Sequence, residues 1–108
     1  MKVPTIVLLA LLCGAALPAR AADPFSQTRI AWNQPHKPFH VIGNVYYVGT
    51  AGVSAFLIRT PAGDILTDGG LPESAPLIEK NIRALGVKLS DVKILLNSHA
   101  HFDHAGGL

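Results

Sequence analysis

The sequence predicts an α/β fold, because two strand hairpins, one amphipathic helix and a final apolar strand follow one another along its 108 residues. The hairpins are indicated by short apolar runs that flank turn-forming residues such as Gly43-Asn44. The helix is indicated by apolar residues at helical spacing. Strands, a helix and a further strand in this order are typical of a layered α/β domain.

The strands can be assigned in chain order. Residues 39–42 and 45–48 flank the Gly43-Asn44 turn and form the first hairpin. Residues 54–59 form the next strand, and its apolar centre shows no alternation, so we expect both of its faces to be covered. A turn at residues 60–64 then leads into residues 65–67 and completes a second hairpin.

The helix is expected over residues 73–85. Ile78, Ile82 and Leu85 lie at positions i, i+4 and i+7 and form one apolar stripe. Ser74 suits the N-cap, and Gly86 suits the position just after the C-terminus. The stripe should pack on the sheet, which makes the helix part of the scaffold. Residues 92–96 then form the strand that leads into the next segment.

Residues 1–21 are expected to be a signal peptide that is not part of the fold. They begin with Met1-Lys2, continue with an apolar run at residues 6–12 and end in the small-residue cleavage site Ala19-Arg20-Ala21. The apolar run is too short to span a membrane. Cleavage would remove the single cysteine, Cys13, and predicts a secreted, periplasmic protein that is not attached to the membrane.

Residues 22–38 are rich in Gln, Asn and Pro, and we expect an irregular N-terminal arm there. Trp32 is the exception in this arm and should pack onto the domain formed by residues 39–108. The charge balance excludes one class of partner. Nine basic and seven acidic residues give a net charge of +2, and two of the nine, Lys2 and Arg20, lie in the leader. Without a basic cluster, no nucleic-acid partner is expected.

A histidine-rich segment follows the last strand. Residues 97–107 (NSHAHFDHAGG) place three of the five histidines and an aspartate within six positions. Imidazole and carboxylate groups are ligands that Zn²⁺ accepts. His99, His101 and Asp103 alternate, so an extended backbone would direct them to one side, and His104 joins them only if the chain turns after His101. The alternative is a solvated histidine-rich loop.

Two zinc ions explain this cluster better than one. Four donors so close in sequence do not easily surround a single tetrahedral ion, because Asp103 and His104 diverge from the pair His99 and His101. We expect His99 and His101 to begin one zinc site and Asp103 and His104 to begin a second. Each site must be completed by residues from elsewhere.

Asp68 is a further candidate site residue, since it follows an apolar strand and precedes Gly69-Gly70. An aspartate beside glycine often only caps its own turn. The end of a strand is also where an α/β protein places its chemistry. Both interpretations are open on the sequence pattern alone.

The spacing His99-x-His101-x-Asp103-His104, after an apolar strand and before Gly-Gly, resembles the signature of the metallo-β-lactamase superfamily. Residues 46–50 (YYVGT) and 68–72 (DGGLP) resemble subclass B3 metallo-β-lactamases in order and spacing. The resemblance implies an αββα sandwich, of which residues 39–108 are the N-terminal part. It also implies that Asp68 lies beneath the metal loop and holds it through hydrogen bonds without binding metal.

The implied reaction is zinc-dependent hydrolysis of the β-lactam amide bond by metal-bound hydroxide, and hence antibiotic resistance. His99 and His101 would hold the ion that activates the hydroxide, and Asp103 and His104 the ion that receives the β-lactam nitrogen. Asp103 would also orient the hydroxide, which gives it a catalytic role. The β-lactam is the expected small-molecule partner.

Family members continue through a second half that supplies further ligands. The chain is therefore expected to be an N-terminal fragment that is inactive alone. Two alternatives are open: another hydrolase of the same superfamily, such as a thioesterase or a lactonase, and an inactive metal-binding fragment. A serine hydrolase is not expected, because neither Ser54 nor Ser98 lies in a nucleophile motif.

Overall fold

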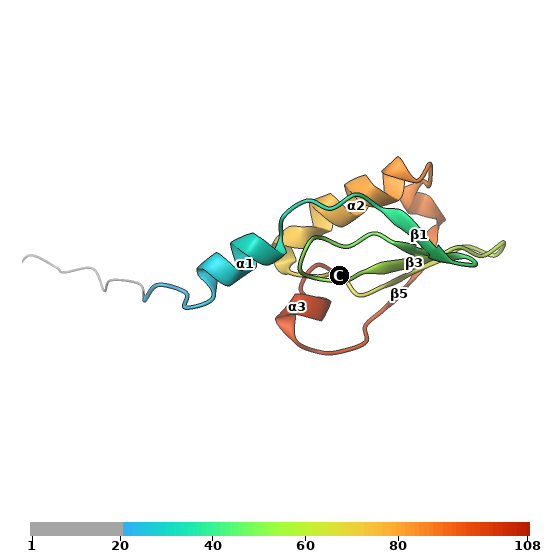
Figure 1. Ribbon diagram of the computed structural model, residues 1–108. Coiled ribbons are helices and arrows are strands. Elements are labelled where there is room, and N and C mark those ends of the chain that lie inside the picture. The colour runs from blue at the N-terminus through green and yellow to red at the C-terminus, as the bar shows by residue number, and fades with distance from the viewer. Residues whose placement is uncertain (1–20) are drawn as a thin grey trace, which may run out of the picture.

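The computed structural model describes residues 21–108, so the expected signal peptide, residues 1–21, lies outside the described residues except for Ala21. Figure 1 shows α2 lying along one face of a sheet and α3 at the end of the sheet to which β5 leads. The elements in chain order are α1 (Ser26–Trp32), β1 (Phe39–Ile42), β2 (Val45–Tyr47), β3 (Phe56–Ile58), β4 (Asp64–Thr67), the 3-10 helix η1 (Pro72–Ser74), α2 (Ala75–Ala84), the 3-10 helix η2 (Leu89–Asp91), β5 (Val92–Leu96) and α3 (Phe102–Ala105).

The predicted α/β fold is confirmed. The five strands form one sheet in the order β1-β2-β3-β4-β5. The first four strands pair antiparallel as two hairpins joined edge to edge. Gly43 has a φ of +53° in the first turn, which glycine adopts without strain. β5 pairs parallel with β4, because the chain crosses over through α2 before it returns.

The apolar stripe of α2 is buried, as its spacing predicts. Ile78 and Ile82 are 3% and 2% exposed, and they pack with sheet and loop residues in the core cluster Val48, Ala55, Leu57, Leu66, Ile78, Ile82 and Val87. Gly86 has a φ of +78° and ends the helix in the left-handed conformation, after which Val87 N donates to Ile82 O at 3.4 Å. Ser74 stands at the N-cap position, but its side chain does not cap α2. Its buried hydroxyl instead accepts from Leu71 N and donates to Asn33 Oδ1.

The expectation that β3 is covered on both faces is wrong for the residues that the structure describes. Leu57 faces the core and is fully buried, whereas Phe56 and Ile58 are half-buried. The β3–β4 and β4–β5 registers pair Phe56 with Thr67 and Thr67 with Leu96, so these side chains share a face of the sheet. Leu96 is 49% exposed. Within residues 21–108 α2 covers one face of the sheet, and the other stays open.

The arm at residues 22–38 is not wholly irregular, because α1 occupies its centre. The prolines that suggested irregularity, Pro24 and Pro35, lie on either side of the helix and do not interrupt it. Asp23 Oδ1 accepts from Phe25 N at 2.9 Å just before the helix begins. After the helix, Gly52 N donates to Trp32 O at 2.9 Å and Thr50 Oγ1 donates to the same carbonyl at 2.6 Å. These bonds fix the helix to the loop that follows β2.

Asn81 makes a buried polar link between α2 and the loop that follows β2. Its side-chain amide donates to Val48 O at 3.0 Å and to Gly49 O at 2.9 Å, and the residue is 7% exposed. Asn81→Leu should lower the free energy of unfolding by about 1–3 kcal/mol, because two buried carbonyls lose their donor. Urea denaturation of the full-length protein measures this. Lys80→Leu, an exposed change on the same helix, should cost less than about 0.5 kcal/mol.

Candidate metal centre

The histidine loop lies where β4 and β5 end. Because the two strands are parallel, their carboxyl ends meet at one edge of the sheet. Asp68 follows β4, and its amide donates to Leu96 O at 2.7 Å, which ties it to the end of β5. The chain then runs from Asn97 to His101 without regular structure and enters α3 at Phe102. This geometry places Asp68 beside the first residues of the loop.

Asp68 is the buried anchor of this loop. It is 8% exposed, and its Oδ1 accepts from Ser98 N at 2.7 Å while its Oδ2 accepts from the Ser98 hydroxyl at 2.5 Å. Its φ is +61°, in the left-handed region that non-glycine residues rarely adopt. The strained backbone directs the carboxylate toward the loop instead of toward its own turn. The hydrogen bonds to Ser98 hold the loop to the end of β4.

The same carboxylate contacts His104. The His104 Nδ1 atom lies 3.2 Å from Asp68 Oδ2 and 3.4 Å from the Ser98 hydroxyl. A carboxylate accepts but does not donate, so the contact assigns the ring proton to Nδ1. The other ring nitrogen, Nε2, then carries the lone pair. Histidines that bind a metal through one ring nitrogen commonly donate the N–H of the other ring nitrogen to a carboxylate.

The environment of Asp68 keeps it charged. Burial alone would raise the pKa of its carboxyl group, but the hydrogen bonds from the side chain and backbone of Ser98, and then from His104, together lower the pKa below its usual value. Asp68 is therefore an anion at neutral pH. This negative charge lies 3.2 Å from the Nδ1 atom of His104.

The imidazole rings of His99, His101 and His104 lie close together in the loop. The ring centroids of His99 and His101 lie 4.0 Å apart, and those of His99 and His104 lie 5.4 Å apart. His101 has extended backbone angles and stands at the N-cap of α3, so the chain turns directly after it. Asp103 and His104 are then on α3, with Asp103 Oδ2 3.7 Å from His104 Nε2. The turn after His101 brings His104 to the histidine pair.

The backbone around α3 is packed against the glycines that follow Asp68. Gly69 N donates to His104 O at 2.8 Å, and Gly70 forms a bridge with Ala105. A Cβ atom on Gly69 would lie 2.6 Å from Leu108 N, closer than real side chains approach. The absence of a side chain at Gly69 is therefore what lets the segment after α3, Gly107 and Leu108, pack against the end of β4.

The donors fit zinc in type, since they are imidazole nitrogens and a carboxylate. The two pairs predicted to share an ion, His99 with His101 and Asp103 with His104, are side-chain neighbours in the structure. Within residues 21–108, no three of the His, Cys, Asp or Glu side chains converge closely enough to hold an ion. Whether each neighbouring pair holds an ion stays a prediction. No helix in the same range is long and apolar enough to cross a membrane.

Sequence reasoning missed part of this site. Ser98 was considered only as a nucleophile, yet it links Asp68 to the loop through both its amide and its hydroxyl. The contact between Arg29 and Phe102 is not indicated by the sequence either. The guanidinium carbon of Arg29 lies 5.9 Å from the centroid of the Phe102 ring, although 73 positions separate them in sequence. No local signal could have paired residues so far apart.

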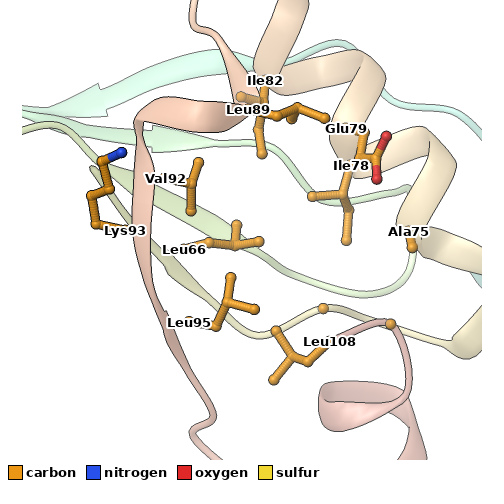
Figure 2. Close-up of a pocket in the computed structure, with 12 residues that line it drawn as sticks. Leu66, Ala75, Ile78, Glu79, Ile82, Leu89, Val92, Lys93, Leu95 and Leu108 are labelled. Carbon is orange, nitrogen blue, oxygen red and sulfur yellow. The ribbon is translucent and has the colours of Figure 1, made fainter. Parts of the chain in front are cut away.

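A separate apolar cavity lies between α2 and the sheet (Figure 2). Its volume is about 430 Å³, and Leu66, Ile78, Ile82, Val92, Leu95 and Leu108 line much of it. Glu79 and Lys93 are the charged residues among its lining, and no histidine contributes. This cavity lies between α2 and strands β4 and β5, and none of the four predicted ligands is among its lining residues.

Comparisons with known proteins agree with this arrangement. A family model described as the metallo-beta-lactamase superfamily matches residues 48–108. Among solved structures, a subclass B3 metallo-β-lactamase from a soil metagenome library is 64% identical, with a TM-score of 0.69 over 70% of this chain and 29% of that chain. A metallo-β-lactamase of Cronobacter sakazakii is 49% identical, with a TM-score of 0.72 over 74% and 31% of the two chains.

A more distant match comes from the curated proteins. An N-acyl homoserine lactonase of Bacillus cereus is 32% identical over 51% of this chain and 31% of the lactonase. The chain spans about 30% of the length of each of these relatives. The family match over residues 48–108, which include the ends of β4 and β5 and the histidine loop, shows that the chain belongs to the metallo-β-lactamase superfamily, with a subclass B3 enzyme among its similar structures.

Proposed function

We propose that the full-length protein is a zinc-dependent β-lactamase of the subclass B3 type, which hydrolyses the amide bond of β-lactam antibiotics and so confers resistance. The observation that carries this proposal is the identity of 49–64% to subclass B3 structures over about 70% of the chain. The family model matches residues 48–108, a range that includes the end of β4 and the histidine loop. The substrate is a small molecule, and the proposal includes two zinc ions.

Zinc, when bound, lowers the pKa of water to about 7 and stabilises the charge that develops on the departing nitrogen. The chain's own residues supply the rest of the arrangement. His99 and His101 offer one pair of imidazoles, and His104 offers Nε2 because Asp68 holds its Nδ1 proton. Asp103, half-buried beside His104, can accept a hydrogen bond from the attacking water and orient it. No covalent bond to the protein is required.

The test is hydrolysis of a carbapenem by the full-length protein, followed as the loss of the β-lactam absorbance. We expect turnover that a chelator abolishes and that added zinc restores. Turnover that persists after exhaustive chelation would contradict the proposal. A purified protein that retains zinc but leaves every β-lactam intact would contradict the choice of substrate.

A second function is supported by the match to N-acyl homoserine lactonases. The same donors would then act on an ester carbonyl in place of an amide. The relevant measurement is the ratio of kcat/KM for a carbapenem to kcat/KM for an N-acyl homoserine lactone on one preparation. We expect the ratio to favour the carbapenem, because the β-lactamase structures are more similar to this chain than the lactonases are. A ratio below one would assign lactonase activity instead.

Export to the periplasm is part of the proposal and is supported by the leader-like residues 1–21. Fractionation of cells that express the full-length gene should place the protein with periplasmic markers. N-terminal sequencing should show that the mature chain starts at Ala22. Retention in the cytoplasm with an intact leader would contradict this assignment.

A further inference from the structure

Arg29 on α1 is held in a fixed position by carboxylates. Its Nε and Nη2 atoms donate to the two carboxylate oxygens of Glu73 at 2.9 and 2.7 Å, and its Nη1 lies 3.3 Å from Asp23 Oδ2. A two-pronged bond of this kind fixes the plane of the guanidinium group. The hydrogen bond from Arg29 lowers the pKa of Glu73, so the pair is charged at neutral pH. Glu73 belongs to η1, which directly precedes α2.

The fixed guanidinium group faces the histidine loop. Its carbon lies 5.9 Å from the centroid of the Phe102 ring, which is within the range of a cation–π interaction. Phe102 is 47% exposed, so about half of its surface is not packed against the rest of the chain. It is the first residue of α3 and stands between His101 and Asp103, one from each predicted half-site. A restraint on Phe102 therefore acts on the backbone that joins the two pairs.

α3 also has direct contacts with the segment that follows β4. Gly69 N bonds to His104 O, and a Cβ atom on Gly106 would lie 2.7 Å from Pro72 N. These contacts come from the segment after β4, whereas Arg29 comes from the N-terminal arm. The arm itself is tied to η1 a second time, because Asn33 Nδ2 donates to Glu73 O at 3.3 Å. α3 is thus contacted directly by the segment after β4 and, through Arg29, by the N-terminal arm that is bound to the same segment.

We propose that Arg29 is a positioning residue for the metal centre. Glu73 clamps Arg29, and Arg29 holds the Phe102 ring. This contact fixes the start of α3, which sets the relative position of His101 and Asp103. Only the part of this inference that concerns zinc binding rests on the proposed function. It assigns the N-terminal arm a role in the site that the histidine motif does not reveal. Arg29 does not contact the predicted ligands, so its effect passes through Phe102.

The first test is hydrogen exchange in the metal-free full-length protein. The amides of His104, Ala105 and Gly106 donate within α3, to His101 O and Phe102 O, so their exchange reports the opening of this helix. Arg29→Gln should speed their exchange about two- to fivefold, as expected for the loss of an exposed cation–π contact. Amides of β3 and β4 should keep their wild-type rates. Equal rates for α3 in Arg29→Gln and the wild type would overturn the inference.

Matched variants separate positioning from general stability. Arg83→Gln removes another exposed arginine that pairs with a glutamate, Glu79, on α2 away from the loop, and should leave α3 exchange unchanged. Arg29→Lys keeps a cation near the ring and should lie closer to the wild type than Arg29→Gln does. In a Phe102→Leu background, Arg29→Gln should have no further effect. If any of these three results is not obtained, Phe102 does not link Arg29 to α3.

The second test is zinc affinity, measured by competition with a chromogenic chelator. Arg29→Gln should weaken zinc binding about two- to fivefold, and Arg83→Gln should not change it. Unchanged affinity in Arg29→Gln would show that α3 is not positioned for zinc by this contact. If exchange and affinity respond but no β-lactam is hydrolysed, the proposed function fails while the role of Arg29 stands.

Discussion

Replacing His101 with alanine in the full-length protein is expected to remove one zinc ion and most of the β-lactamase activity. His101 stands between the extended loop and α3, and its ring is the near neighbour of His99. Loss of one imidazole leaves that half-site with a single donor from this chain. Zinc contributes several kcal/mol of transition-state stabilisation, so turnover should fall about 10²-fold or more. Atomic absorption and initial rates on one preparation measure both effects.

The control for this change is His40→Ala. His40 is an exposed histidine in β1, the edge strand of the sheet opposite to β5. Its Nε2 atom lies 2.8 Å from Gly43 O. This variant should keep the zinc content and the turnover of the wild type within about twofold. If His101→Ala and His40→Ala behave alike, the histidine loop does not bind the catalytic metal.

Asp68→Asn is expected to have the second largest effect. Asparagine tolerates a φ near +60° and keeps one oxygen acceptor, so the backbone and part of the bonding to Ser98 should survive. The negative charge that holds the His104 Nδ1 proton is lost. Changes to groups that orient a metal ligand cost about 10–100-fold in metal affinity or activity. We expect a loss in this range, measured by chelator competition and by kcat/KM.

Asp64→Asn is the matched control, because Asp64 is also a buried aspartate of the β4 segment. It lies at the opposite end of that strand, 2% exposed, with Oδ2 2.9 Å from Arg59 Nε. This change should lower the free energy of unfolding and leave zinc affinity unaltered. The opposite pattern, with zinc affinity lost in Asp64→Asn and kept in Asp68→Asn, would contradict the role assigned to Asp68.

Local patterns were sufficient to predict most of the fold. The helix stripe at Ile78 and Ile82, the turn at Gly43 and the strand before the histidines all depend on neighbours within a few positions. The prediction for the N-terminal arm failed for a related reason. Composition averaged over residues 22–38 concealed a segment free of proline, and α1 forms there with its end tied to Thr50 and Gly52.

Spacing alone could predict only the part of the site whose residues are close in sequence, and the role of Asp68 was indicated by the family resemblance. The spacing of His99, His101, Asp103 and His104 indicates the donors, and the turn after His101 follows from the need to bring His104 back. The contacts of Asp68 with Ser98 and His104 depend on the parallel pairing of β4 with β5, which no local pattern specifies. The contact of Arg29 with Phe102 depends on where a short helix lies in space.

The most direct test of this account is a crystal of the full-length protein grown with excess zinc and measured at wavelengths on either side of the zinc absorption edge. The account predicts two anomalous peaks, one beside His99 and His101 and one beside Asp103 and His104, with Asp68 bonded to His104 and to neither ion. Well-ordered side chains at these four positions with no anomalous density beside them would contradict it.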